Sequence, residues 1–155
     1  MRGRLFLIAV FCGFLGGTTP APAATGRVIK VLPQFLDKDG RHALSPSLYE
    51  RDAYQAYLRK HPEEQSGMRF AIQWKTHGGV YSPLKLRVEI RGTIKDGLPT
   101  HTVLETEVKP GGWFSHWASL PLTGDTWTKS GEVIAWRATL WEGDTLLSEQ
   151  KSFLW

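Results

Sequence analysis

Apolar and charged residues alternate without exception from Leu84 to Ile90, and this pattern constrains the fold more than any other feature of the chain. Side chains of consecutive residues in an extended segment point to opposite faces, so this segment has one apolar face and one charged face. Such a strand packs on a hydrophobic core from one side only. Residues 68–74 and 134–140 alternate in a similar way. We therefore expect these three segments to be the central strands of a β-domain.

Clusters of Gly, Pro and Asp divide the rest of the chain into short segments, as in all-β domains. Four further strands are expected between these turns, over residues 27–32, 102–108, 113–120 and 145–154. Gly143-Asp144 is a two-residue loop of the kind that joins two strands as a tight hairpin. The last segment has apolar residues on both faces, so its register stays open. The sequence thus predicts seven strands.

One helix is expected over residues 47–60, between the first and second strands. Ser47 and Glu50 have the spacing of a capping box, in which each side chain satisfies a free backbone N–H, and Pro62 ends the helix. Four polar residues share one side of this helix, while three tyrosines occupy much of the remaining arc. Since so wide an apolar arc exceeds what one sheet face buries, we expect the helix to cover part of the β-domain and to leave at least one tyrosine accessible.

Seven short strands with one early helix predict a mainly β fold, a seven-stranded sandwich of two sheets with the helix inserted between the first and second strands. Over about residues 27–155, this pattern resembles the immunoglobulin and fibronectin type III domains in architecture. The chain lacks the cysteine pair and the tyrosine corner of antibody domains. Residues 44–59, LSPSLYERDAYQAYLR, are similar to a segment of small exported bacterial proteins of unassigned function, which implies a bacterial source.

The N-terminus has the three parts of a secretory signal peptide. Arg2 and Arg4 precede an apolar run from Leu5 to Leu15, and Ala21-Pro22-Ala23 provides the small residues of a cleavage site. The run is shorter than the roughly 20 residues that span a bilayer. We therefore expect a signal peptide at 1–23 and a single domain at 24–155, exported to the periplasm or the extracellular space without a membrane span. A retained N-terminal anchor is the alternative.

Removal of residues 1–23 changes both the charge and the cysteine content. It leaves 17 basic and 15 acidic residues, so the mature net charge is +2 and a nucleic-acid partner is not indicated. It also removes Cys12, the one cysteine in the chain. The mature domain would then have no disulfide in an oxidising compartment, and its hydrophobic core alone must stabilise it.

The sequence carries no recognisable catalytic or metal motif. It has no G-x-S-x-G nucleophile elbow, and its five histidines have no metal-ligand spacing. Asp37-Lys38-Asp39-Gly40 lacks the Gly and Glu positions of a calcium loop and is interpreted as a turn. A catalytic site assembled from scattered residues would leave no such motif. We expect a protein that is not an enzyme and binds no cofactor or metal.

Seven tryptophans are the unusual feature of the composition, and six of them follow residue 100. Trp74 and Trp136 are expected inside by their position in the alternation, whereas Trp113 and Trp117 share a face with serines. Exposed tryptophan can belong to a surface covered by the helix, bind a protein partner or stack on a sugar. The candidate binding residues are Trp113, Trp117, Trp141, Tyr54 and Tyr57.

The absent catalytic motifs and the surplus of aromatic residues together predict a non-catalytic, exported β-sandwich binding module. Its expected partner is another envelope or secreted protein. The alternative is a glycan-binding module that uses exposed tryptophans.

Overall fold

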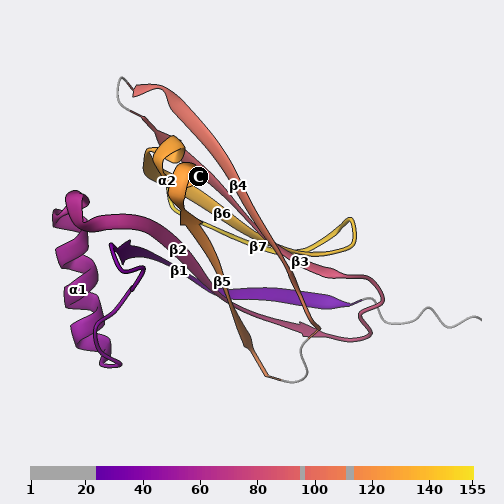
Figure 1. Ribbon diagram of the computed structural model, residues 1–155. Coiled ribbons are helices and arrows are strands. Elements are labelled where there is room, and N and C mark those ends of the chain that lie inside the picture. The colour runs from indigo at the N-terminus through magenta and orange to yellow at the C-terminus, as the bar shows by residue number, and fades with distance from the viewer. Residues whose placement is uncertain (1–23, 95–96, 111–113) are drawn as a thin grey trace, which may run out of the picture.

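The computed structural model describes residues 24–94, 97–110 and 114–155, so the expected signal peptide lies outside the described residues. Two antiparallel sheets with seven strands in all face each other, and one long helix lies between the first and second strands (Figure 1). The elements are β1 Thr25–Asp37, α1 Leu48–Lys60, a 3-10 turn Pro62–Glu64, β2 Gln65–His77, β3 Leu84–Thr93, β4 Pro99–Val108, β5 His116–Thr123, α2 Gly124–Ser130, β6 Glu132–Glu142 and β7 Thr145–Lys151. The predicted mainly β sandwich with a helix between β1 and β2 is confirmed. No helix in the described ranges is long and apolar enough to cross a membrane.

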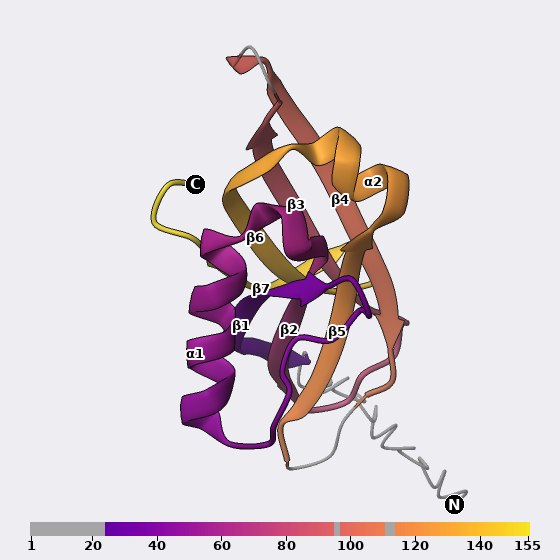
Figure 2. The same cartoon turned by 60° about the vertical axis from the view of Figure 1, so that its left-hand side comes forward.

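The strand order is β1-β2-β5 in one sheet and β4-β3-β6-β7 in the other. The chain passes from one sheet to the other between β2 and β3, between β4 and β5, and between β5 and β6. Figure 2 shows α1 beside β1, at the edge of the three-stranded sheet. Each sheet therefore has one face on the core and one outer face, and α1 stands next to the outer face of β1-β2-β5.

The core lies between the two sheets and comes mainly from the predicted alternating strands. Leu84, Leu86, Val88 and Ile90 of β3 are all buried. In β2, the alternating residues from Met68 to Trp74 are buried against them. These two predicted faces are confirmed.

The inner face predicted for the third alternating segment, residues 134–140, is partly wrong, because β6 contains a bulge. Val133 pairs with Gly92 and Ala135 pairs with Arg91, so Ile134 is the extra residue and is 43% exposed. Trp136 still packs against the core, but it is only half-buried. Gly92 is required at this point, because a Cβ there would lie 2.4 Å from the carbonyl oxygen of Ser130. Alternation in the sequence carries no sign of an inserted residue, so the bulge was not predicted.

Two predicted boundaries near the C-terminal half also differ from the structure. One of the turns expected between strands, at Thr123-Gly124-Asp125, is instead the start of α2, a short polar helix with Asp125 in its first turn. The helix was not predicted because its sequence has no apolar periodicity. The last strand ends at Lys151, and a second irregularity falls between Leu140 and Trp141 of β6. The Gly143-Asp144 hairpin is confirmed, since Glu142 pairs with Thr145.

The helix α1 begins and ends as predicted. Ser47 is its N-cap, and its hydroxyl accepts a hydrogen bond from the Glu50 N–H, while the helix ends at Lys60, two residues before Pro62. The predicted packing of its apolar arc is wrong, because Leu58 is its one buried residue in the structure. Tyr49 and Tyr57 are 83% and 47% exposed, so the expectation of an accessible tyrosine is confirmed.

Candidate functional site

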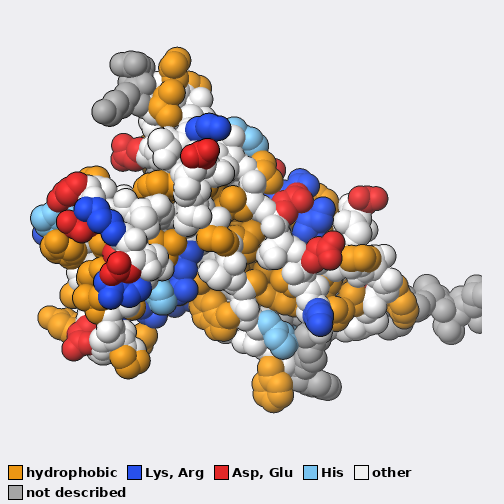
Figure 3. All heavy atoms as spheres, in the orientation of Figure 1, with side chains coloured by type: hydrophobic (Ala, Val, Ile, Leu, Met, Phe, Trp, Pro, Cys, Tyr) orange, Lys and Arg blue, Asp and Glu red, His pale blue; other side chains and the backbone are white. Residues whose placement is uncertain are grey.

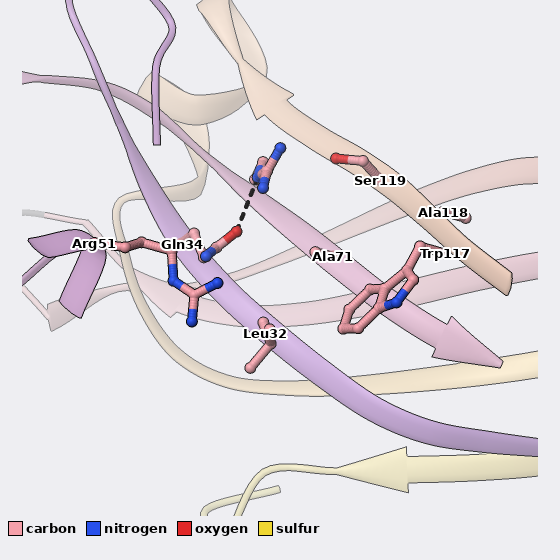
Figure 4. Close-up of a pocket in the computed structure, with 8 residues that line it drawn as sticks. Leu32, Gln34, Arg51, Ala71, Trp117, Ala118 and Ser119 are labelled. Carbon is pink, nitrogen blue, oxygen red and sulfur yellow. Dashed lines mark hydrogen bonds between the residues drawn. The ribbon is translucent and has the colours of Figure 1, made fainter. Parts of the chain in front are cut away.

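A groove of about 310 Å³ lies on the outer face of the three-stranded sheet (Figure 4). The strand register explains its floor. Leu32, Ala71 and Ser119 form one row across the three strands, and Gln34 pairs with Arg69 in the next row. Ala71 and Ser119 are small, whereas the residues on either side of that row are large, so the sheet surface is depressed there. We call this depression, with the α1 residues beside it, the sheet groove.

Trp117 lines one end of the sheet groove. It faces outward because its neighbours in β5, Ala118 and Leu120, pair with core residues of β2 and occupy the inner face. The side chain is 54% exposed, which leaves much of the indole available to a ligand. Gln73 is its cross-strand partner, and the Gln73 amide donates a hydrogen bond of 2.9 Å to the Ser115 hydroxyl.

Polar contacts hold α1 as the wall of the sheet groove. The Gln55 amide accepts a hydrogen bond of 2.8 Å from the Phe35 N–H and donates one of 3.0 Å to the Phe35 carbonyl. It also donates to the carbonyl of His42, at 2.8 Å. Gln55 thus pairs with the free edge of β1 much as a neighbouring strand would. The inward face of α1 is therefore formed by Arg51, Gln55 and residues near them, which the helical pattern had assigned to the solvent side.

The second anchor of α1 is the pair of Tyr54 and Asp37. The Tyr54 hydroxyl donates a hydrogen bond of 2.7 Å to the Asp37 carboxylate, and the Arg41 guanidinium donates another of 2.9 Å. Burial alone would raise the pKa of Asp37, but the hydrogen bonds from Tyr54, Arg41 and the Asp39 N–H outweigh it and lower the pKa to about 2. The same bond, with burial, raises the pKa of Tyr54 to about 12. Asp37 is therefore charged and already engaged at neutral pH.

Two arginines line the sheet groove. Arg51 extends from α1, the wall (Figure 4), and Arg69 belongs to β2, the central strand of the floor. Arg69 donates a hydrogen bond of 2.9 Å to the neutral amide of Gln34. Burial and the nearby charge of Arg51 lower the pKa of Arg69. Burial, then Arg69 and Arg51, likewise lower the pKa of His42, so this part of the molecule has a positive potential.

A second depression of about 280 Å³ continues the sheet groove along α1. It shares Leu32, Gln34 and Arg51 with the first and extends to Gln55 and Arg59. The two depressions are contiguous through these shared residues. They form an elongated site rather than a compact pocket.

The outer face of the four-stranded sheet has a different character. Arg87 pairs with Glu105, Lys85 lies 3.5 Å from the same carboxylate, and Arg137 pairs with Glu89. The hydrogen bond from Arg87, which outweighs burial, lowers the pKa of Glu105. Figure 3 shows acidic and basic side chains next to one another over β3 and β4. Opposite charges already neutralise one another on this face.

The structure distributes the five candidate residues over separate surfaces. Trp113 lies outside the described residues. Trp117 lines the sheet groove, whereas Trp141 is on the outer face of the other sheet, where its indole N–H donates a hydrogen bond of 2.8 Å to Thr139. Tyr54 is engaged with Asp37, and Tyr57 stacks on His61 at 4.2 Å between ring centroids.

Sequence reasoning did not single out Arg51, Arg69 or Gln34 as site residues. Each occurs where a solvent-exposed polar residue is ordinary, on the polar side of the helix or of a strand. The signal that points to them is the near absence of acidic residues from β1, β2 and β5, and it can be recognised only once the strand order places these strands in one sheet.

Among residues 24–94, 97–110 and 114–155, no three His, Cys, Asp or Glu side chains gather closely enough to hold a metal ion. No protein-family model, no curated protein and no solved structure matches this chain.

Proposed function

We propose that this protein is an exported, non-catalytic binding module, and that its sheet groove holds a segment of another envelope or secreted protein. The observation that carries the proposal is Trp117, which is 54% exposed at the end of an elongated groove that also contains two arginines. Tryptophan and arginine are enriched among the residues that contribute most to protein–protein binding. Burial of the indole against a partner would remove this apolar surface from water.

The surroundings of the sheet groove favour a protein as its occupant. Leu48 and Tyr49, at the start of α1, are 65% and 83% exposed. Phe114, shortly before β5, is 83% exposed. A partner that also covered these exposed side chains would bury more apolar surface than the groove alone provides, as a protein interface requires.

The strand order supports an immunoglobulin-like architecture for this module. The three-stranded sheet comprises the first, second and fifth strands, and the fourth strand pairs with the third in the other sheet. In antibody constant domains, the fourth strand instead joins the sheet of the first, second and fifth. The architecture proposed here is thus a variant in which the fourth strand has changed sheets, which leaves β5 as an edge strand of the three-stranded sheet.

Export is part of the proposal. The first strand begins at Thr25, so cleavage after Ala23 would leave every strand intact. N-terminal sequencing of the protein recovered from the periplasm or medium of a bacterial host is expected to start at Ala24. Recovery of the whole chain in the cytoplasm or in the membrane fraction would contradict export or cleavage.

Site-specific photocrosslinking tests the binding role. A benzophenone amino acid at Ser119, on the floor of the sheet groove, is compared with one at Glu107, which is exposed on the opposite sheet. The expected result is a defined crosslinked protein from position 119 and none from position 107. The crosslinked protein is then purified, and its affinity is expected to fall about tenfold or more with Trp117→Ala and to be unchanged with Val103→Ala. Equal crosslinking at both positions would contradict the proposal.

A glycan ligand is the second candidate. The observation that favours it is the Gln73 amide beside Trp117, since a sugar can stack on the indole and form hydrogen bonds with such an amide. Titration with soluble polysaccharides, followed by the amide and indole resonances of residues 73 and 117, distinguishes this candidate. Saturable shifts at these positions that Trp117→Ala abolishes would favour the glycan.

A further inference from the structure

The basic residues of this molecule are distributed unequally between the two sheets. Strands β1, β2 and β5 contain four basic residues and a single acidic one, Asp37, which Tyr54 and Arg41 already engage. Strands β3, β4, β6 and β7 contain five basic and six acidic residues. The net positive charge of the strands is thus confined to the sheet that carries the sheet groove.

This charge faces outward. Arg27 and Lys75 are opposite each other, Lys30 is opposite Gln73, and Arg69 is opposite Gln34. All are on the face away from the core, because the residues next to them in β2, from Met68 to Trp74, point inward. Figure 3 shows basic, histidine and acidic side chains together on and beside α1. An approaching anion would meet mainly basic residues on this face of the sheet, while Asp52 of α1 lines the continuation of the groove.

Arg69 and Arg51 are the cations best placed to hold that anion. Among the described residues, no carboxylate forms an ion pair with Arg69. Arg51 has one weak partner, Asp52, at 3.5 Å, and the Asp52 side chain is 76% exposed to screening water. Two guanidinium groups that line one groove repel each other, and a carboxylate between them would replace repulsion with two charge-assisted interactions.

We infer that the sheet groove recognises an acidic segment of a partner protein, with an Asp or Glu carboxylate seated between Arg51 and Arg69 and a neighbouring apolar side chain on Trp117. The inference rests on the proposed function and specifies its ligand. The elongated shape supports a peptide segment, because the groove continues past Arg51 and the acidic Asp52 to Arg59, a third cation. An extended peptide would thus turn every second side chain toward the groove, so the acidic and the apolar side chain that it places there are two positions apart.

Designed peptides test this chemistry directly. The probe is a fluorescein-labelled octapeptide in which two Glu and two Leu residues alternate as pairs, so that each face of the extended peptide carries both kinds of side chain, and the controls replace every Glu with Gln or with Lys. Fluorescence anisotropy is expected to show saturable binding of the Glu peptide alone, with an affinity that falls as salt is raised. Binding of the Gln or Lys peptide with equal affinity would overturn the inference.

Substitutions test whether the peptide binds in the sheet groove. Arg51→Gln and Arg69→Gln are each expected to weaken the Glu peptide about tenfold or more, whereas Lys85→Gln removes the same charge from the opposite sheet and should have no effect. Arg51 is on the surface of α1, so Arg51→Gln should fold even if Arg69→Gln, which loses the hydrogen bond to Gln34, perturbs β2. Thermal unfolding checks the fold of both variants. Equal weakening by Lys85→Gln would overturn the inference, because it would show that only net charge matters.

The outcome also separates this inference from the proposed function. If position 119 crosslinks a protein that Trp117→Ala releases but the Arg51 and Arg69 variants do not, the binding role stands and the acidic ligand is wrong. If polygalacturonate binds in an arginine-dependent manner and the Glu peptide does not, the occupant is an acidic glycan, and the peptide inference is overturned.

Discussion

The hydrogen bond from Tyr54 to Asp37 should stabilise the protein in proportion to the charge on the carboxylate. Tyr54→Phe keeps the aromatic ring but removes the hydroxyl, which lies 2.7 Å from the carboxylate oxygen. The Asp37 side chain is only 7% exposed, so water cannot readily replace the lost donor. The substitution therefore tests how α1 is attached to β1, and hence how the wall of the sheet groove is held in place.

The magnitude follows from the pKa of Asp37. Its fall from 3.8 to about 2 corresponds to a stabilisation of about 2 kcal/mol at neutral pH, shared among the several donors that surround the carboxylate. Tyr54 provides the largest of these stabilising contacts. Tyr54→Phe should therefore lower the free energy of unfolding at pH 7 by roughly 1 to 2 kcal/mol. Tyr57→Phe is the matched control, because Tyr57 is half exposed and its ring stacks on His61. It should change stability by less than about 0.5 kcal/mol.

The pH dependence gives the sharper test. Because the pKa of Asp37 is lower in the folded protein than in the unfolded chain, its contribution is complete above about pH 4 and is lost as the pH falls toward 2. The stability difference between the wild-type protein and Tyr54→Phe should narrow over the same interval. Urea unfolding, followed by circular dichroism from pH 2.5 to 7, measures it. An equal loss at both ends of this range would refute the reasoning, because it would show that the hydroxyl acts through packing rather than through the carboxylate.

Three further outcomes are expected. Trp74→Ala should lower the free energy of unfolding by about 3 to 5 kcal/mol, because Trp74 is 2% exposed. Trp136→Ala should lower it clearly less, because Trp136 is half-buried. Urea unfolding midpoints compare the two variants, and equal losses would contradict the assigned burial. Gly92→Ala should destabilise by about 1 to 3 kcal/mol, since its Cβ would lie 2.4 Å from the Ser130 carbonyl oxygen; an unchanged midpoint would show that β6 can shift. A chain that starts at Ala24 contains no cysteine, so reductant should leave its melting temperature unchanged in a thermal scan.

Local periodicity was sufficient to predict the strands whose two faces differ most. The alternation in β2 and β3 places every second residue from Met68 to Trp74 and from Leu84 to Ile90 in the core, as predicted. It failed where one residue is inserted into a ladder, as at Ile134, because a bulge depends on the partner strand and on the close approach of Gly92 to the chain around Ser130. It also failed for α2, whose seven residues have no apolar period.

The helix α1 shows which features local sequence predicts and which depend on distant residues. Its boundaries are set by local residues, Ser47 at one end and Pro62 beyond the other, and local chemistry predicted them correctly. Its orientation is set by Gln55, which forms hydrogen bonds with the backbone N–H and carbonyl of Phe35, a residue 20 positions away. A polar side chain that satisfies the edge of a distant strand cannot be told from a solvated one by helical periodicity alone. Two of the three tyrosines, Tyr49 and Tyr57, are therefore exposed, whereas Gln55 faces the sheet.

Identifying the candidate site requires both the local sequence pattern and the tertiary contacts. Trp117 could be identified as a candidate from its serine-rich strand face, but Arg51 and Arg69 come from a helix and a strand whose proximity requires the tertiary fold. Their significance lies in what surrounds them, since the three strands beneath them have one acidic residue and the four strands opposite have six. Charge composition per sheet becomes readable only after the strand order is known. That order separates the cations of β1 and β2 from the glutamates that could neutralise them, and it leaves the sheet groove as the part of the strand surface where an anion would be bound most favourably.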